Sequence, residues 1–231
     1  MMDLSRLPRW EKIGHLTESN DGEYCISGLS FANEDFPGVV AVSSARDCYD
    51  TRAKMFLDLM VSSQDLDKIA LAWLYHQAVP YFVGTESFPT GFPLCHADFS
   101  NCNFLFDAAY NLTGVIDWSG AQSTPWELFC VFPHEFSSRY APDGDVDVES
   151  HNLFISIFEQ EEHKVNPNIP MAKFMRSKAG RIAELVEYYQ YLSAASAMPW
   201  RGIRELMGLM YGDGVEWEDI RTKAKAALHI S

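Results

Sequence analysis

The segment from Phe92 to Trp118 differs in its hydrophobic pattern from the rest of the chain. It contains short apolar runs separated by polar and turn-forming residues, whereas the long stretches on either side carry apolar residues at helical spacing. The runs are Phe92–His96, Asn103–Phe106 and Leu112–Ile116, and the last two are joined by turn-forming residues typical of a hairpin. This pattern predicts an α+β, mostly helical fold with a small central β-hairpin patch.

The predicted helices before the strand patch begin at recognisable capping signals. Residues 44–47 form a capping-box pattern, and apolar side chains follow at helical spacing as far as Met60. Residues 62–65 repeat the signal ahead of a second helix that ends near Pro80. After the strand patch, the periodicity predicts helices over 149–163, 171–196, 203–210 and 218–229.

The chain has no internal repeat and no linker long enough to separate two domains, so we expect a single domain over residues 1–231. Residues 1–42 are rich in glycine, proline and asparagine, which predicts an irregular segment with one or two short strands, one of them around 24–26. Residues 43–231 are expected to form a helical lobe. The loop at 96–103 and the hairpin at 103–118 lie within this lobe.

Composition limits the partners of the chain. Eighteen basic and thirty-two acidic residues give a net charge of −14, which disfavours binding to the phosphate backbone of nucleic acids. The longest apolar stretch, Ile69–Val79, is too short to cross a bilayer, and the N-terminal residues lack the apolar region of a signal peptide. The five cysteines are widely spaced, which is typical of reduced thiols. We therefore expect a cytoplasmic protein with no nucleic-acid or membrane partner.

Polar residues gather within the strand patch. His96, Asp98 and Asn103 form the pattern H-x-D-x-x-x-x-N, and Asp117 ends an apolar strand fourteen residues after Asn103. A carboxylate can accept the proton of an attacking hydroxyl, and amide and carboxylate oxygens are preferred ligands of Mg²⁺. These residues predict phosphoryl transfer, with Asp98 as the catalytic base. Asn103 and Asp117 are then the metal ligands that bind the nucleotide cofactor through Mg²⁺.

The stretches HADFSNCNFLFD and LTGVIDWSGAQSTPWEL resemble the aminoglycoside phosphotransferase and choline kinase family, which has the protein-kinase-like fold. That family carries H-G-D-x-x-x-x-N, then a strand hairpin, then I-D-W or I-D-F. Residues 12–16 and 43–49 resemble the start of the family's C-terminal lobe. The resemblance implies ATP and Mg²⁺ as cofactors, with a small-molecule hydroxyl as the acceptor.

The chain departs from the family pattern in several places. Ala97 replaces the family's glycine, and Ser100 stands where histidine is common. Only about ninety residues precede His96, and they contain no G-x-G-x-x-G loop and no strand lysine in a V-A-I-K-like context. We therefore expect only the C-terminal lobe, without the N-terminal β lobe, and weak or absent binding of ATP. The surface facing the missing lobe is expected to be partly apolar and open to a partner or a second copy, with candidate residues Trp10, Phe31 and Phe36.

Three functions remain open on this basis. The first is an ATP- and Mg²⁺-dependent phosphotransferase, and the second is a pseudokinase-like binding or interaction module that has lost turnover. The third is a helical interaction protein whose motif is vestigial. In the first two, His96 is expected to orient the catalytic loop through its ring nitrogens rather than to react.

Overall fold

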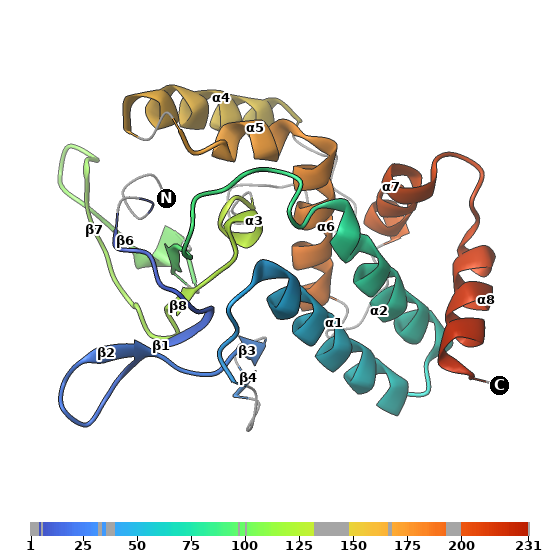
Figure 1. Cartoon of the computed structure of the whole chain (residues 1–231). Helices are drawn as coiled ribbons and strands as arrows, with labels where there is room; N and C mark the ends of the chain where they lie inside the picture. The colour runs from blue at the N-terminus through green and yellow to red at the C-terminus, as the bar shows by residue number, and fades with distance from the viewer. Residues whose placement is uncertain are drawn as a thin grey trace.

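The computed structural model describes residues 5, 7–31, 34–35, 40–96, 98–99, 101–131, 148–165, 168–192 and 200–230. The fold is α+β and mostly helical, with small antiparallel sheets, as the sequence predicts. Figure 1 shows the strands on one side of the molecule and the helical pairs α1/α2 and α7/α8 on the other.

The elements are short in the strand-rich part and longer in the helical part. The helices are α1 (Ala45–Ser62), α2 (Leu66–Ala78), α3 (Trp126–Phe129), α4 (Val148–Val165), α5 (Met171–Arg176), α6 (Lys178–Leu192), α7 (Trp200–Tyr211) and α8 (Trp217–Leu228), with 3₁₀ turns η2 (Val79–Tyr81) and η3 (Asn101–Asn103). The strands are β1 (Gly14–Glu18), β2 (Tyr24–Ile26), β3 (Ser30–Phe31), β4 (Glu34–Asp35), β5 (Leu94–Cys95), β6 (Phe104–Phe106), β7 (Leu112–Val115) and β8 (Gln122–Ser123).

Helix α1 begins where the capping signal predicts. The hydroxyl oxygen of Ser44 accepts a hydrogen bond from the backbone N–H of Asp47 at 3.0 Å, which satisfies one of the free donors of the first turn. The Asp47 carboxylate accepts from the Ser44 hydroxyl at 2.7 Å rather than from the Ser44 backbone, so only half of the capping box forms. In α2 the cap is Asp65, at the end of the predicted signal.

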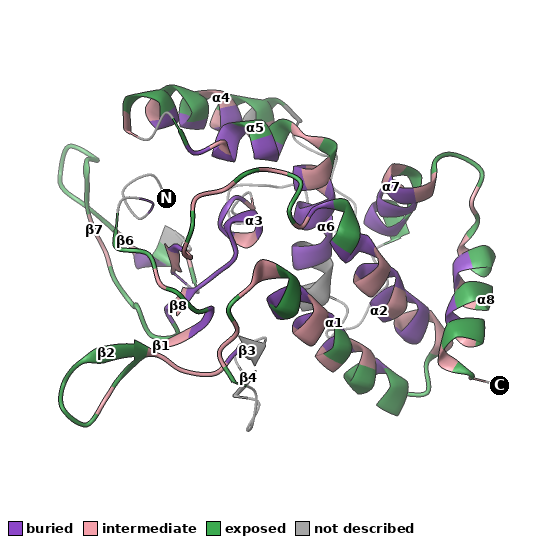
Figure 2. Cartoon of the chain, viewed as in Figure 1, coloured by how far each residue is buried: buried purple, intermediate pink, exposed green. Residues whose placement is uncertain are grey.

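The hydrophobic core lies among the helices. Figure 2 shows buried residues concentrated on α2, α3 and α6, and exposed residues along the β1–β2 and β6–β7 hairpins. Helices α1 and α2 pack together through the stacked rings of Phe56 and Tyr75, whose centroids lie 5.8 Å apart. Arg52 of α1 and Glu187 of α6 add a buried ion pair, with two hydrogen bonds of 2.8 and 2.9 Å.

The prediction of a single long helix over 171–196 is wrong, because the helix is interrupted at Ser177, which separates α5 from α6. Ser177 has an extended backbone, and its hydroxyl oxygen accepts from the N–H of Gly180 at 3.0 Å, as an N-cap does. Gly180 lies so close to the end of α5 that an added Cβ would be 2.0 Å from the carbonyl oxygen of Phe174. A local cap and a close backbone contact therefore override the continuous helical pattern. Residues 193–196 lie outside the described part of the chain.

A four-stranded sheet joins the N-terminal segment to the strand patch, in the order β2-β1-β8-β5. Strand β1 pairs antiparallel with β8, and β8 pairs with β5, so that Gly14 and Leu94 both face Ser123 in register. The Ser123 hydroxyl donates to the carbonyl of Lys12 at 2.6 Å and accepts from the N–H of Gly14 at 3.2 Å. The sheet thereby anchors β5, which leads directly to His96.

The surface proposed for a partner is described only in part. The backbone of Trp10 forms an antiparallel bridge with Phe92, and the Trp10 side chain is half-buried. The side chain of Phe31 and the whole of Phe36 lie outside the described residues. An exposed apolar patch over all three residues therefore stays a prediction.

The described helices include none that is both long and apolar enough to cross a membrane. All five cysteines are free thiols, as expected. Cys25 and Cys102 are exposed, whereas Cys48 and Cys130 are buried. Burial raises the pKa of the Cys48 thiol to about 12, so this thiol is an inert part of the core.

Candidate functional site

The site is built on the predicted hairpin of β6 and β7. The two strands pair antiparallel, with Phe104 opposite Val115 and an irregularity after Leu105. At the turn, the Asp107 carboxylate accepts hydrogen bonds from both the backbone and the side chain of Asn111. These bonds lower the pKa of Asp107, with the Asn111 side chain as the largest cause. The turn therefore holds the hairpin at the end away from the candidate site.

His96 connects the loop at 96–103 to the end of β7. Its buried ring accepts a hydrogen bond at Nδ1 from the N–H of Asp98 at 3.2 Å, and its Nε2 lies 2.9 Å from the carbonyl oxygen of Ile116. A carbonyl oxygen can only accept, so Nε2 carries the proton and the imidazole is neutral. His96 thus orients the loop through both ring nitrogens, as the sequence predicts.

Asn103 holds Asp98 from the other side. Its Nδ2 donates to the backbone oxygen of Asp98 at 2.9 Å and to the carboxylate Oδ2 at 3.0 Å. Its own backbone oxygen accepts from the N–H of Ile116 at 2.9 Å. The donor end of the amide therefore faces Asp98, and the amide oxygen Oδ1 is the Asn103 atom that can bind a cation.

Asp117 directly follows Ile116, the residue whose backbone is bonded to both His96 and Asn103. Its φ angle is 58°, in the left-handed region, which aspartate tolerates better than most residues. The Ser119 hydroxyl donates to its carboxylate Oδ1. Within the described part of the chain, neither Asp117 nor Asp98 forms an ion pair with a lysine or arginine, and both carboxylates are exposed.

Aromatic rings pack around this polar frame. The ring of Trp118 lies edge-on to the imidazole of His96 at 4.7 Å, and its Nε1 donates to the carbonyl of Val115 at 3.0 Å. Phe99 packs edge-on against Phe104 at 4.8 Å. Phe99 also lies edge-on to the imidazole of His96, with ring centroids 6.1 Å apart. Trp118 and Phe99 thus both pack against the buried imidazole, which reduces the freedom of the loop that carries Asp98.

The segment after Asp117 braces the loop that precedes β5. Trp126 of α3 donates from its indole nitrogen to the carbonyls of Pro89 and Gly91 at 3.2 and 3.0 Å. The neighbouring Glu127 is buried and accepts from the N–H of Gly84 at 3.1 Å. Burial raises the pKa of Glu127, and the hydrogen bonds only partly oppose this effect.

The structure therefore brings Asp98 and Asn103 into direct contact. Asp117 follows Ile116, whose backbone bonds to Asn103 directly and reaches Asp98 only by way of His96. The supporting roles of Ile116, Trp118 and Ser119 were not predicted, although the I-D-W-S stretch contains them.

The described residues hold no cluster of three or more histidine, cysteine, aspartate or glutamate side chains that could bind a metal alone. Mg²⁺ commonly takes only one or two carboxylates and completes its shell with water and substrate phosphates. Asn103 and Asp117 are suited to that kind of shared site.

Comparisons of the chain with protein-family models, with curated proteins and with solved structures find no match.

Proposed function

We propose that this protein is an ATP- and Mg²⁺-dependent phosphotransferase of the aminoglycoside phosphotransferase and choline kinase type, acting on a small-molecule hydroxyl. The main support is the hydrogen-bonded frame in which His96 and Asn103 both hold Asp98 and both bond to Ile116. Such a frame fixes a base and a metal ligand relative to each other. Fixed positions matter because phosphoryl transfer depends on positioning and charge stabilisation.

Each polar residue has one role in this proposal. The exposed Asp98 carboxylate orients the acceptor hydroxyl and accepts its proton as the oxygen attacks the γ-phosphorus of ATP. Asn103 Oδ1 and the Asp117 carboxylate hold Mg²⁺ against the phosphates. The bond between the γ-phosphorus and the bridging oxygen of ADP breaks, so the products are the phosphorylated acceptor and ADP.

A binding module without turnover is the second candidate, and the lack of a paired cation beside the two carboxylates is the observation that supports it. In the described ranges, no lysine or arginine pairs with Asp98 or Asp117. Cationic side chains that stabilise the charge of the transferred group contribute several orders of magnitude to phosphoryl transfer. If Asn103 and Asp117 held Mg²⁺, the metal would supply part of that stabilisation, enough to bind a nucleotide but with slow transfer.

Release of ADP tests the proposal. The protein is incubated with ATP, Mg²⁺ and a panel of small alcohols and amino alcohols, and the Asp98→Asn variant is compared with wild type. The asparagine keeps an acceptor for the Asn103 amide but cannot take the proton, so the rate should fall by about 10²–10⁴-fold. Asp58→Asn, at an exposed position of α1, serves as the matched control and should leave the rate unchanged. Equal rates for wild type and the Asp98 variant would rule out the proposed base.

Alkylation of Cys102 separates binding from turnover. This exposed thiol is next to Asn103, whereas the exposed Cys25 lies on β2 and serves as an internal control. Mg²⁺–ATP should slow iodoacetamide modification of Cys102 and leave that of Cys25 unchanged. Protection without ADP release supports the binding module, and protection with ADP release supports the enzyme. Absence of both contradicts both functions.

A further inference from the structure

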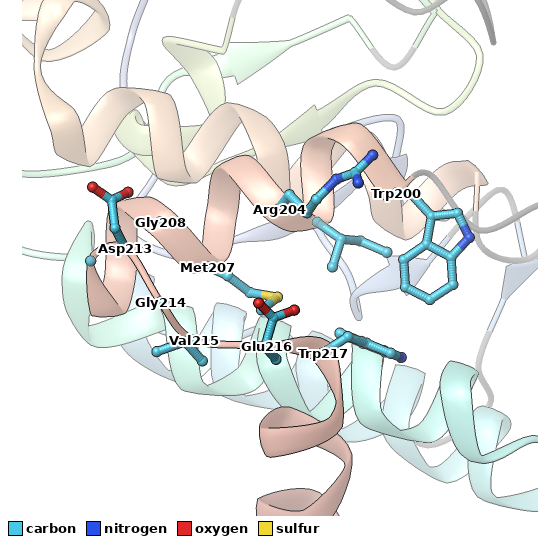
Figure 3. Close-up of a pocket in the computed structure, with 11 residues that line it drawn as sticks. Trp200, Arg204, Met207, Gly208, Asp213, Gly214, Val215, Glu216 and Trp217 are labelled. Carbon is cyan, nitrogen blue, oxygen red and sulfur yellow. The ribbon is translucent and has the colours of Figure 1, made fainter.

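Helices α7 and α8 and the turn between them line a cavity of about 460 Å³ that is open to solvent (Figure 3). It lies on the side of the molecule away from the β6–β7 hairpin (Figure 1). Its apolar lining comes from both helices and the turn between them, and consists of Trp200, Ile203, Met207, Val215 and Trp217. This volume is within the range of small-molecule sites, which are largely apolar with a few placed polar groups.

The two indoles of the cavity are held in place. The rings of Trp200 and Trp217 lie edge-to-face, with centroids 5.4 Å apart and an interplanar angle of 84°. The indole nitrogen of Trp217 donates to the Asp67 carboxylate of α2 at 2.8 Å. Because a neighbouring helix fixes Trp217, this end of the cavity is a preformed aromatic wall.

Glycines keep the cavity open. Gly208, Gly212 and Gly214 all line it, and a Cβ added at any of them would meet no atom within 4 Å. Gly212 and Gly214 have φ angles of 83° and 94°, which the turn between the helices requires. Gly208 lies inside α7 with an ordinary helical backbone and is exposed, so a side chain added there would extend into the cavity without strain in the backbone.

Charges of opposite sign lie at the two ends of the cavity. Figure 3 shows Arg204 beside Trp200, Asp213 at the far end and Glu216 between them. Among the described residues, Arg204 and Asp213 have no hydrogen-bond or ion-pair partner. Glu216 is partly engaged, because its carboxylate accepts from the N–H of Asp219 in the α8 capping box.

From this arrangement we propose that the cavity binds a small zwitterion with an apolar body, of the kind formed by an apolar dipeptide with free ends. The ligand carboxylate pairs with the Arg204 guanidinium, and the ligand ammonium pairs with Asp213, with Glu216 as a second acceptor. The apolar side chains contact Met207 and the indole of Trp217.

The spacing of the charges favours a dipeptide over a single amino acid. Arg204 lies seven residues before the end of α7, which corresponds to about 10 Å along the helix axis. The ends of an extended dipeptide lie about 7 Å apart, and the Arg204 side chain can span the remainder. The charged ends of a free amino acid lie closer together, which leaves a longer gap for the Arg204 side chain to span.

Calorimetric titration with leucyl-phenylalanine tests this proposal. Acetylation of the dipeptide amine and amidation of its carboxylate should each weaken binding by about tenfold, since each removes one charged pair. Free phenylalanine, as the single-amino-acid ligand, should bind more weakly than the dipeptide. Absence of saturable binding by the free dipeptide would overturn the proposal, and so would equal affinity of the blocked dipeptides.

Variants assign the binding to the cavity. Gly208→Leu should abolish it by filling the space, whereas Ala226→Leu, at an exposed position of α8, should leave it intact. Arg204→Gln should bind the free and the amidated dipeptide with equal affinity, because the cation that pairs with the carboxylate is gone. Lys54→Gln on α1 is its control and should keep the difference in affinity. Circular dichroism and thermal unfolding confirm that each variant folds. Wild-type affinity in folded Gly208→Leu would contradict the assignment.

Discussion

The strand-rich half and the helical half of this molecule are stabilised in different ways. Around the β6–β7 hairpin, the Asp98 and Asp117 carboxylates are exposed, and the hairpin is held by backbone bonds and a single buried imidazole. In the helical half, large side chains are fully buried, and the Arg52–Glu187 ion pair is enclosed between α1 and α6. The helices therefore provide most of the stability, while the hairpin keeps polar atoms accessible.

The largest expected effect comes from breaking the buried ion pair. Glu187→Gln leaves the Arg52 guanidinium buried without a counter-charge and should lower the free energy of unfolding by about 3–5 kcal/mol. Glu161→Gln removes an exposed pair with Lys164 and should cost about 0.5 kcal/mol or less. Urea unfolding measures both. Similar costs for the two variants would contradict the view that buried helical contacts dominate stability.

Two glycines of the helical half should respond in opposite directions to alanine. Gly180→Ala forces a methyl group against the Phe174 carbonyl and should destabilise the protein by about 1–3 kcal/mol. Gly208→Ala meets open space inside a helix and should stabilise it by about 0.5–1 kcal/mol. Thermal unfolding of the two variants compares them directly. A stabilising Gly180→Ala would show that the junction of α5 and α6 is not tightly packed.

In the strand-rich half, His96→Ala tests whether one side chain holds the loop. The variant loses the ring bonds to the Asp98 N–H and the Ile116 carbonyl, which should cost about 1–2 kcal/mol. Hydrogen exchange should increase at the amides of Asp98 and Ile116, while the amides of α2 keep their protection. Unchanged exchange at the hairpin would mean that the imidazole is dispensable.

The smallest effect concerns the pH dependence of stability at Glu127. Burial raises its pKa in the folded protein, so the folded state binds more protons than the unfolded state above the ordinary glutamate range. The contribution of Glu127 to stability is therefore complete at low pH and is lost as the pH rises through the raised pKa. Glu127→Gln keeps an acceptor for Gly84 and should flatten this fall. Parallel profiles of unfolding free energy against pH for wild type and Glu127→Gln would contradict the raised pKa of Glu127.

Local patterns predicted much of this structure. The capping residues of α1, the β6–β7 hairpin and the cluster of Asp98 with Asn103 each depend on residues close together in the chain, so periodicity and motif spacing could indicate them. Asp117 was predicted from its position at the end of an apolar strand.

The remaining features depend on contacts between distant segments. Two contacts join residues more than one hundred positions apart, and no local pattern encodes them. They are the pairing of Gly14 with Ser123 and the hydrogen bond from Trp217 to Asp67. The break at Ser177 was missed because apolar periodicity continues through it, while the deciding contact is the approach of Gly180 to the Phe174 carbonyl. The cavity between α7 and α8 was missed because the open space at Gly208 appears only once the two helices are placed.

Binding of Mn²⁺ in the presence of ATP, measured by electron paramagnetic resonance, tests the central claim that Asn103 and Asp117 hold a nucleotide-bound metal. We expect wild type to remove Mn²⁺–ATP from solution and Asp117→Asn to bind it at least about tenfold more weakly. Asp58→Asn should bind it as wild type does. Equal binding by wild type and Asp117→Asn, or absence of binding by wild type, would contradict the account.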